Sequence, residues 1–126
     1  MTALLNSAER TALSEHIERL NVLLDQACAA FRARFSFSAV ITFAHDKKER
    51  TVAFRKNGEE WAFMCESYDP PSDILSCSLA LRMAFAPQLP ALWYACQQRE
   101  ADSYKDLARA RSAAEEFLSN VRRESP

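Results

Sequence analysis

Four cysteines and two histidines are the side chains best suited to metal binding or nucleophilic catalysis; they are Cys28, Cys65, Cys77, Cys96, His16 and His45. Structural zinc sites and redox motifs use cysteines separated by two to four residues, because close ligands must converge on one centre. No two of these cysteines are that close in the sequence. We therefore expect four buried thiols in a reducing cytoplasm, with neither a metal ion nor another cofactor.

The histidines offer little more for acid–base catalysis. His45 precedes Asp46, and a carboxylate next to an imidazole can orient it for proton transfer. That pair falls between two predicted strands, where a solvated turn explains it, and His16 falls at the edge of a predicted helix. Gly58 is the single glycine, which excludes phosphate-binding loops and nucleophile elbows because both need several glycines. We predict a protein that is not an enzyme.

Charge is balanced over the whole chain but not along it. The net charge is -1, which provides no overall attraction to nucleic acid or anionic membranes. Residues 32–56, however, contain seven basic and two acidic residues. Basic side chains at two hairpin tips could contact a phosphate backbone; the candidates are Lys47, Lys48, Arg50, Arg55 and Lys56. Nucleic-acid binding is therefore the weaker of two candidate functions.

The hydrophobic pattern predicts the helices and strands that position these side chains. Apolar residues recur at spacings of three and four through residues 7–34, as in a helix with one core-facing side. Asn6 and Glu9 have the spacing of a capping box at the start of this segment. The first element is therefore predicted to be one long helix.

After this helix the period of the apolar residues changes to two, which predicts strands at residues 35–45, 50–56 and 59–67. The three strands follow one another closely, as in an antiparallel meander.

Asn57-Gly58 is a strong signal for a two-residue hairpin turn between the second and third strands. Such a turn would place Lys56 opposite Glu59. Phe54 would then lie opposite Trp61, which is a favourable aromatic pair.

The two faces of this sheet carry unlike side chains. One alternate set is large and consists of Phe37, Ile41, Phe43, Val52, Phe54, Trp61, Phe63 and Cys65. The other set, which we call the small-residue face, includes Val40, Thr42, Ala44, Ala53, Arg55, Glu60, Ala62 and Met64. Small, weakly apolar side chains are unusual on a solvated face, so we expect either a protein partner or the C-terminal helices of this chain to cover it.

Apolar residues alternate in residues 74–86, as in a strand, but the Leu, Ala, Met and Arg content favours a helix. We predict a helix over 72–86, with a fourth strand at 74–86 as the alternative. Helices at 90–98 and 101–122, or one helix through both, complete the chain. The expected fold is one α+β domain over residues 1–126, with a long N-terminal helix, a three-stranded antiparallel meander and two to three C-terminal helices.

Neither an export signal nor a membrane span is predicted. The first ten residues lack a basic start and an apolar stretch, and prolines interrupt the weakly charged residues 74–98. We expect a small cytoplasmic protein whose partner is another protein or a second copy of itself, with no membrane involved. The predicted function is non-catalytic binding by an inhibitor, chaperone, immunity, assembly or regulatory protein, through the small-residue face and the amphipathic helices.

Overall fold

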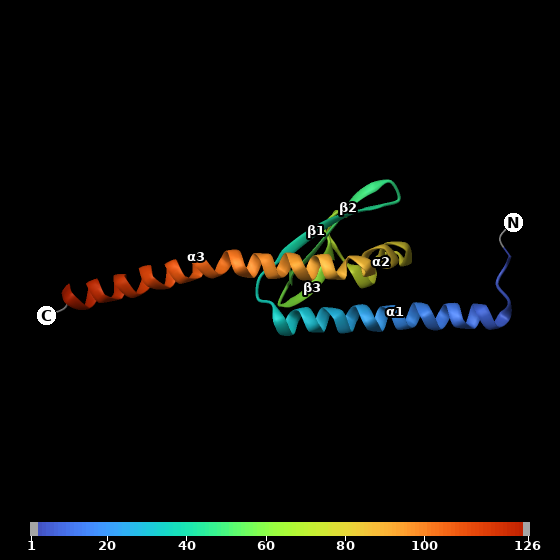
Figure 1. Ribbon diagram of the computed structural model, residues 1–126, viewed down its shortest axis with the longest axis horizontal. Helices are drawn as coiled ribbons and strands as arrows, with labels where there is room; N and C mark the ends of the chain where they lie inside the picture. Colours follow the sequence, from blue (N-terminus) through green and yellow to red (C-terminus); the bar gives the residue numbers. More distant parts are fainter. Residues whose placement is uncertain (1–2, 125–126) are drawn as a thin grey trace.

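The computed structural model describes residues 3–124 and has the expected α+β fold (Figure 1). A long helix, a four-stranded antiparallel sheet and C-terminal helices follow in that order. The elements are α1 (Ser7–Arg34), β1 (Ala39–His45), β2 (Lys48–Asn57), β3 (Glu60–Cys65), β4 (Ser72–Asp73), the 3-10 turn η1 (Ile74–Ser76), α2 (Leu79–Phe85), the 3-10 turn η2 (Ala86–Gln88) and α3 (Leu89–Glu124).

Helix α1 has the bounds predicted for it. The Asn6 side chain accepts a hydrogen bond from the Glu9 backbone N–H at 2.8 Å, and Glu9 Oε1 accepts one from the Asn6 N–H at 3.1 Å. This capping box satisfies two backbone donors that a helix start leaves unpaired. The sequence signal therefore identified the start of α1 correctly.

The sheet has the strand order β1-β2-β3-β4, and its second hairpin differs from the prediction. Asn57 pairs with Glu60 and Lys56 pairs with Trp61, so the register is shifted by two residues. The loop is Gly58-Glu59, not Asn57-Gly58, and Gly58 has φ = +70°. A glycine at the first loop position is typical of a type II′ turn, whereas an Asn-Gly loop is typical of type I′. A two-residue shift preserves the faces of the strands, so the predicted faces remain correct.

The first hairpin uses a type I′ arrangement without glycine. Asp46 and Lys47 form its two-residue loop, and both have positive φ, at +53° and +59°. The left-handed conformation costs a non-glycine residue about 1 kcal/mol or more, and aspartate tolerates it better than lysine does. Lys47 is therefore the less favourable residue of this turn.

Exchanging side chains at the two turns should change stability in opposite directions. We expect Gly58→Val to lower the free energy of unfolding by about 1–2 kcal/mol, because valine strains a backbone with positive φ although no atom lies in its way. The reverse change, Lys47→Gly, should raise it by up to about 1 kcal/mol. Urea denaturation measures both, and equal stability of Gly58→Val and the wild type would contradict the turn geometry.

Residues 35–38 lie outside the first strand, contrary to the prediction of a strand over 35–45. The Phe35 N–H donates to the Phe31 carbonyl at 2.8 Å, which closes the end of α1. The Phe35 ring packs against Phe31 and Trp93, with ring centroids 5.9 and 4.7 Å apart. Packing against two helices therefore overrides the alternating pattern, and β1 begins only at Ala39.

Residues 72–86 form a strand, a turn and a helix rather than one helix. The fourth strand exists, but it is Ser72–Asp73 and pairs with Met64 and Cys65, whereas the alternative prediction places a strand at 74–86. Ser78 caps α2 by accepting a hydrogen bond from the Leu81 N–H at 3.2 Å. The predicted helix is therefore present only over Leu79–Phe85.

The C-terminal helices predicted at 90–98 and 101–122 are one continuous helix, α3. The polar residues between them, which suggested a joint, are helical and contain neither glycine nor proline. Within residues 3–124, no helix is long and apolar enough to cross a membrane.

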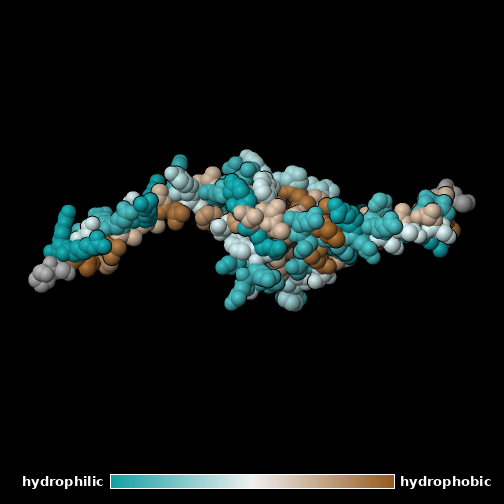
Figure 2. Space-filling model, turned by 90° about the horizontal axis from the view of Figure 1, so that it is seen from below, coloured by the Kyte–Doolittle hydropathy of each residue, from teal (hydrophilic) through white to brown (hydrophobic). Residues whose placement is uncertain are grey.

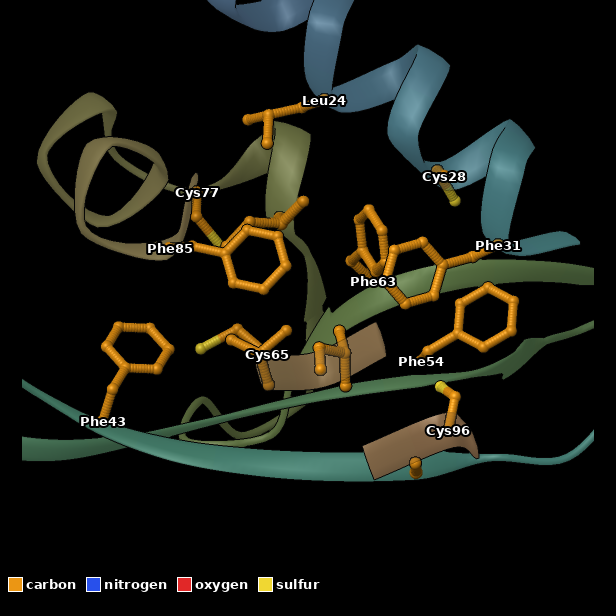
Figure 3. Close-up of a cluster of buried hydrophobic side chains, with 14 of the residues drawn as sticks. Leu24, Cys28, Phe31, Phe43, Phe54, Phe63, Cys65, Cys77, Phe85 and Cys96 are labelled. Atoms are coloured by element: carbon orange, nitrogen blue, oxygen red, sulfur yellow. The ribbon is translucent and has the colours of Figure 1, made fainter. Parts of the chain in front are cut away.

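The core lies between the large-residue face of the sheet and all three helices (Figure 3). Phe31 of α1 packs against Phe54 and Phe63 of the sheet, with ring centroids 5.3 and 4.9 Å apart, and Leu24 and Cys28 of α1 belong to the same cluster. α2 and α3 add Leu81, Phe85, Leu92 and Cys96 to the same cluster. The helices therefore pack on the large-residue face, and the expectation that C-terminal helices cover the small-residue face is wrong.

Candidate functional site

The structure brings the predicted partner-binding residues together on one face of the sheet. Val40, Ala53 and Met64 lie side by side across β1, β2 and β3. Ala62 lies beside Arg55 in the same way. The remaining members, Thr42, Ala44 and Glu60, share this face because residues two apart in a strand point the same way.

Only part of the small-residue face is accessible. Val40 is 56% exposed and Thr42 and Ala44 are exposed, but Ala53, Ala62 and Met64 are buried. The short alanines are flanked by longer side chains of neighbouring strands, and Arg55 forms an ion pair with Glu66 beside them. A partner would therefore contact mainly the β1 side of this face.

The basic residues proposed for nucleic-acid contact do not form one surface. Lys47 and Lys48 lie at one end of β2, whereas Arg55 and Lys56 lie near its other end, about 25 Å away. The hydrogen bond to Glu66 raises the pKa of Arg55 above its ordinary value, and the same contact neutralises its charge. The half-buried Arg50 guanidinium lies 5.9 Å from the centre of the Tyr68 ring. Of the five candidates, Lys47, Lys48 and Lys56 alone remain exposed.

The cysteines are free and buried in the core, as the sequence analysis expected. Burial raises the pKa of Cys28, and it raises the pKa of both Cys77 and Cys96 to about 11. Such thiols are weak nucleophiles at neutral pH because almost none of them is ionised.

Cys28 also has a structural role at the edge of β3. Its thiol lies 3.7 Å from the Trp61 carbonyl oxygen, which accepts a hydrogen bond from Arg32 at 3.2 Å. These α1 side chains cover a strand edge that β4 is too short to pair with.

The two histidines lie on different elements of the fold. His16 is exposed on α1, and His45 ends β1 next to the turn residue Asp46. Within residues 3–124, no hydrogen bond joins either histidine to a cysteine. No three metal-binding side chains are grouped in that part of the chain.

An exposed apolar surface lies on the second half of α3, where no candidate site residue was predicted. Every residue from 104 to 124 is exposed, and we call these residues the distal segment. Figure 1 shows it extending well beyond the sheet, on the opposite side from the N-terminus of α1. Four large side chains on it, which we call the distal stripe, are half or more exposed: Tyr104 at 74%, Leu107 at 62%, Phe117 at 65% and Leu118 at 50%.

The distal stripe continues the face with which α3 packs on the core. Leu92 and Cys96 are buried there, and spacings of three and four connect them through Glu100 and Ser103 to Leu107. Arg34, the last residue of α1, forms an ion pair with Glu100 at 2.5 Å. The sheet and the helices packed on it, which we call the body of the protein, therefore end close to this point. The same face of α3 is therefore buried before residue 104 and exposed after it. Figure 2 shows hydrophobic atoms along one side of the distal segment.

The distal segment also has a hollow on this face. It is lined by Tyr104, Leu107, Ala108, Arg111, Ser112 and Glu115. The first four residues have the spacing i, i+3, i+4 and i+7, which is the arrangement that receives one side chain of a neighbouring helix in coiled coils. The small side chains of Ala108 and Ser112 leave the space open, and Arg111 bonds to Glu115 at 2.9 Å at its rim.

A second apolar hollow lies between α1 and α2. It is lined by Leu13, His16, Ile17, Leu20, Leu79 and Met83. It is smaller than the hollow on the distal segment, and it adjoins the core through Leu20.

Comparison with known proteins finds no match: no family model, no curated protein and no solved structure is significantly similar to this chain.

Proposed function

We propose that this chain is a non-catalytic protein-binding module whose main binding surface is the distal stripe of α3. One observation carries the proposal: a helical segment of 21 residues extends from the body with its apolar side toward solvent. A single helix of that length is marginally stable in water, and most helical stability in proteins comes from packing of an apolar side. A partner that covers the stripe would supply that packing.

The position of the apolar side chains supports binding rather than chance exposure. Isolated surface leucines and aromatics are common, but contiguous apolar patches mark interaction sites. Tyr104 and Leu107 are one helical turn apart, Leu118 continues the same side of α3, and Phe117 lies at the edge of that side. Opposite this stripe, Arg109 and Glu116 keep the other side of the helix polar. An amphipathic segment of this kind is suited to packing against another helix.

A photo-crosslinking amino acid placed at residue 107 or at residue 109 tests this function in cells. Both positions are exposed, but only Leu107 belongs to the distal stripe, so position 109 is the matched control. We expect a discrete ultraviolet-dependent protein adduct from position 107 and none from position 109. Absence of an adduct at both positions would refute the proposal, and mass spectrometry of the adduct identifies the partner.

A further inference from the structure

We infer that the partner of the distal stripe is the distal stripe of a second copy, packed antiparallel to it about a two-fold axis between Ser112 and Ala113. The inference rests on the proposed function, because it names the partner of the same surface. Four features of the distal segment support it: its symmetric spacing, its charges, its hollow and its length.

The first feature is the spacing of the positions on the side of α3 that carries Tyr104, Leu107 and Leu118 of the distal stripe. These positions are 104, 107, 111, 114, 118 and 121, and they are separated by three and four residues in an order that reads the same in both directions. Two antiparallel copies can therefore align each of these positions of one helix with one of them on the other. In this register Leu107 lies opposite Leu118, and the shorter Ala114 lies opposite Arg111. A two-fold dimer requires such a self-complementary surface.

The second feature is charge. Residues 102–112 contain three basic and two acidic side chains, whereas residues 113–124 contain two basic and three acidic ones. The antiparallel register brings the first half, with a net charge of +1, alongside the second half, with a net charge of -1. A parallel pair in register would place each charge beside its own copy, which is unfavourable. The charges therefore favour the antiparallel arrangement.

The third feature is the hollow around Tyr104, Leu107, Ala108 and Arg111. These four residues line its first part and are centred between residues 107 and 108, and the antiparallel register places Leu118 of the second copy opposite them. Leu118 would enter this part of the hollow. Its side chain is 50% exposed, so it is not already engaged in the core. The two-fold axis produces this contact twice.

The fourth feature is length. The register overlaps residues 101–124 of the two helices, which is the part of α3 beyond its buried face. The two bodies then lie at opposite ends of the paired helices, about 30 Å apart along the axis, and do not collide. The four large side chains alone would remove roughly 800 Å² from water in the pair. The small residues and the Arg111 stem beside them bring this close to the ~1,000 Å² of a weak specific interface.

Analytical ultracentrifugation of the full chain tests this dimer. We expect the mass to rise from 14.3 kDa to twice that value as concentration increases through the micromolar range. Leu107→Lys or Leu118→Glu alone should weaken the dimer about a hundredfold or more, because each dimer then buries two unpaired charges. Arg109→Glu lies on the opposite side of α3 and serves as the control with unchanged dimerisation. All three positions are exposed, and circular dichroism confirms that each variant is folded.

Combining Leu107→Lys and Leu118→Glu in one chain determines the register. In the antiparallel dimer, the lysine introduced at position 107 of one copy faces the glutamate introduced at position 118 of the other, so the double variant should regain the dimer. An equimolar mixture of the two single variants should also form a heterodimer. A parallel dimer would instead place the two introduced lysines beside each other, and the double variant would not recover.

Several results would overturn the inference. A wild-type protein that stays monomeric throughout the micromolar range contradicts it, and so does a dimer that the double variant fails to restore. A monomer whose crosslinker at residue 107 captures a different protein also overturns the dimer, but it leaves the proposed function intact. A monomer with no adduct at residue 107 overturns both.

Discussion

Replacing Leu92 with alanine is expected to lower the free energy of unfolding by about 2–5 kcal/mol, the range for buried leucines. Leu92 is fully buried, and it attaches the first part of α3 to the core. Alanine would leave a cavity there, because the surrounding sheet and helix backbones can collapse only partly. A domain of this size is stable by only about 5–15 kcal/mol, so this one change removes a large share.

Leu4 is the matched control for this measurement. It is 91% exposed and lies before α1, so Leu4→Ala should change the free energy of unfolding by no more than about 0.5 kcal/mol. Urea denaturation at one protein concentration, low enough to keep the chain monomeric, measures both variants. Similar effects of Leu92→Ala and Leu4→Ala would show that α3 does not pack on the core as described.

The thiols of Cys77 and Cys96 should react with an alkylating reagent at pH 8 at least about a hundredfold more slowly in the folded protein than in urea. Burial raises the pKa of each to about 11 from an ordinary value of 9.0. Each pKa unit reduces the reactive thiolate about tenfold at that pH, and burial also limits access of the reagent. Mass spectrometry of labelled peptides measures each cysteine separately.

An exposed cysteine provides the reference for this experiment. Ser119→Cys on the distal segment should label at the rate of the unfolded chain, because residue 119 is exposed. Rapid labelling of Cys77 or Cys96 in the folded protein would contradict their burial.

The same pKa shifts imply loss of stability at high pH. Between pH 9 and about 11 the thiols of the unfolded chain ionise, whereas those of the folded chain remain protonated. The unfolded state is therefore stabilised relative to the folded state as pH rises through this window, and below pH 9 these thiols have no effect on stability.

Local signals predicted those parts of the fold that depend on nearby residues. The capping box at Asn6 and the absence of helix breakers defined α1, because these interactions involve residues within one or two turns. Alternation along the strands identified the two faces of the sheet correctly. It could not detect the two-residue shift at Gly58, because such a shift leaves every side chain on the same face.

The bounds of other elements depend on contacts with neighbouring helices and strands. Phe35 continues the alternating pattern of β1, but its ring packs on Phe31 and Trp93, and the chain stays out of the sheet there. Residues 72–73 pair with β3 although the segment reads as the beginning of a helix. Neither contact follows from hydrophobic periodicity, since Phe35 packs on Trp93 of α3 and Ser72 pairs with Cys65 of the neighbouring strand.

The sequence by itself determined that residues 101–122 are helical and which side of that helix is apolar, because hydrophobic periodicity depends only on spacing. Only the tertiary structure decided what covers that side. Leu92 and Cys96 lie on the core, the body ends near the Arg34–Glu100 ion pair, and Leu107 and Leu118 beyond it face solvent. Periodicity identifies the apolar side of a helix. Whether that side is buried within the same chain depends on whether other elements lie close enough to pack on it.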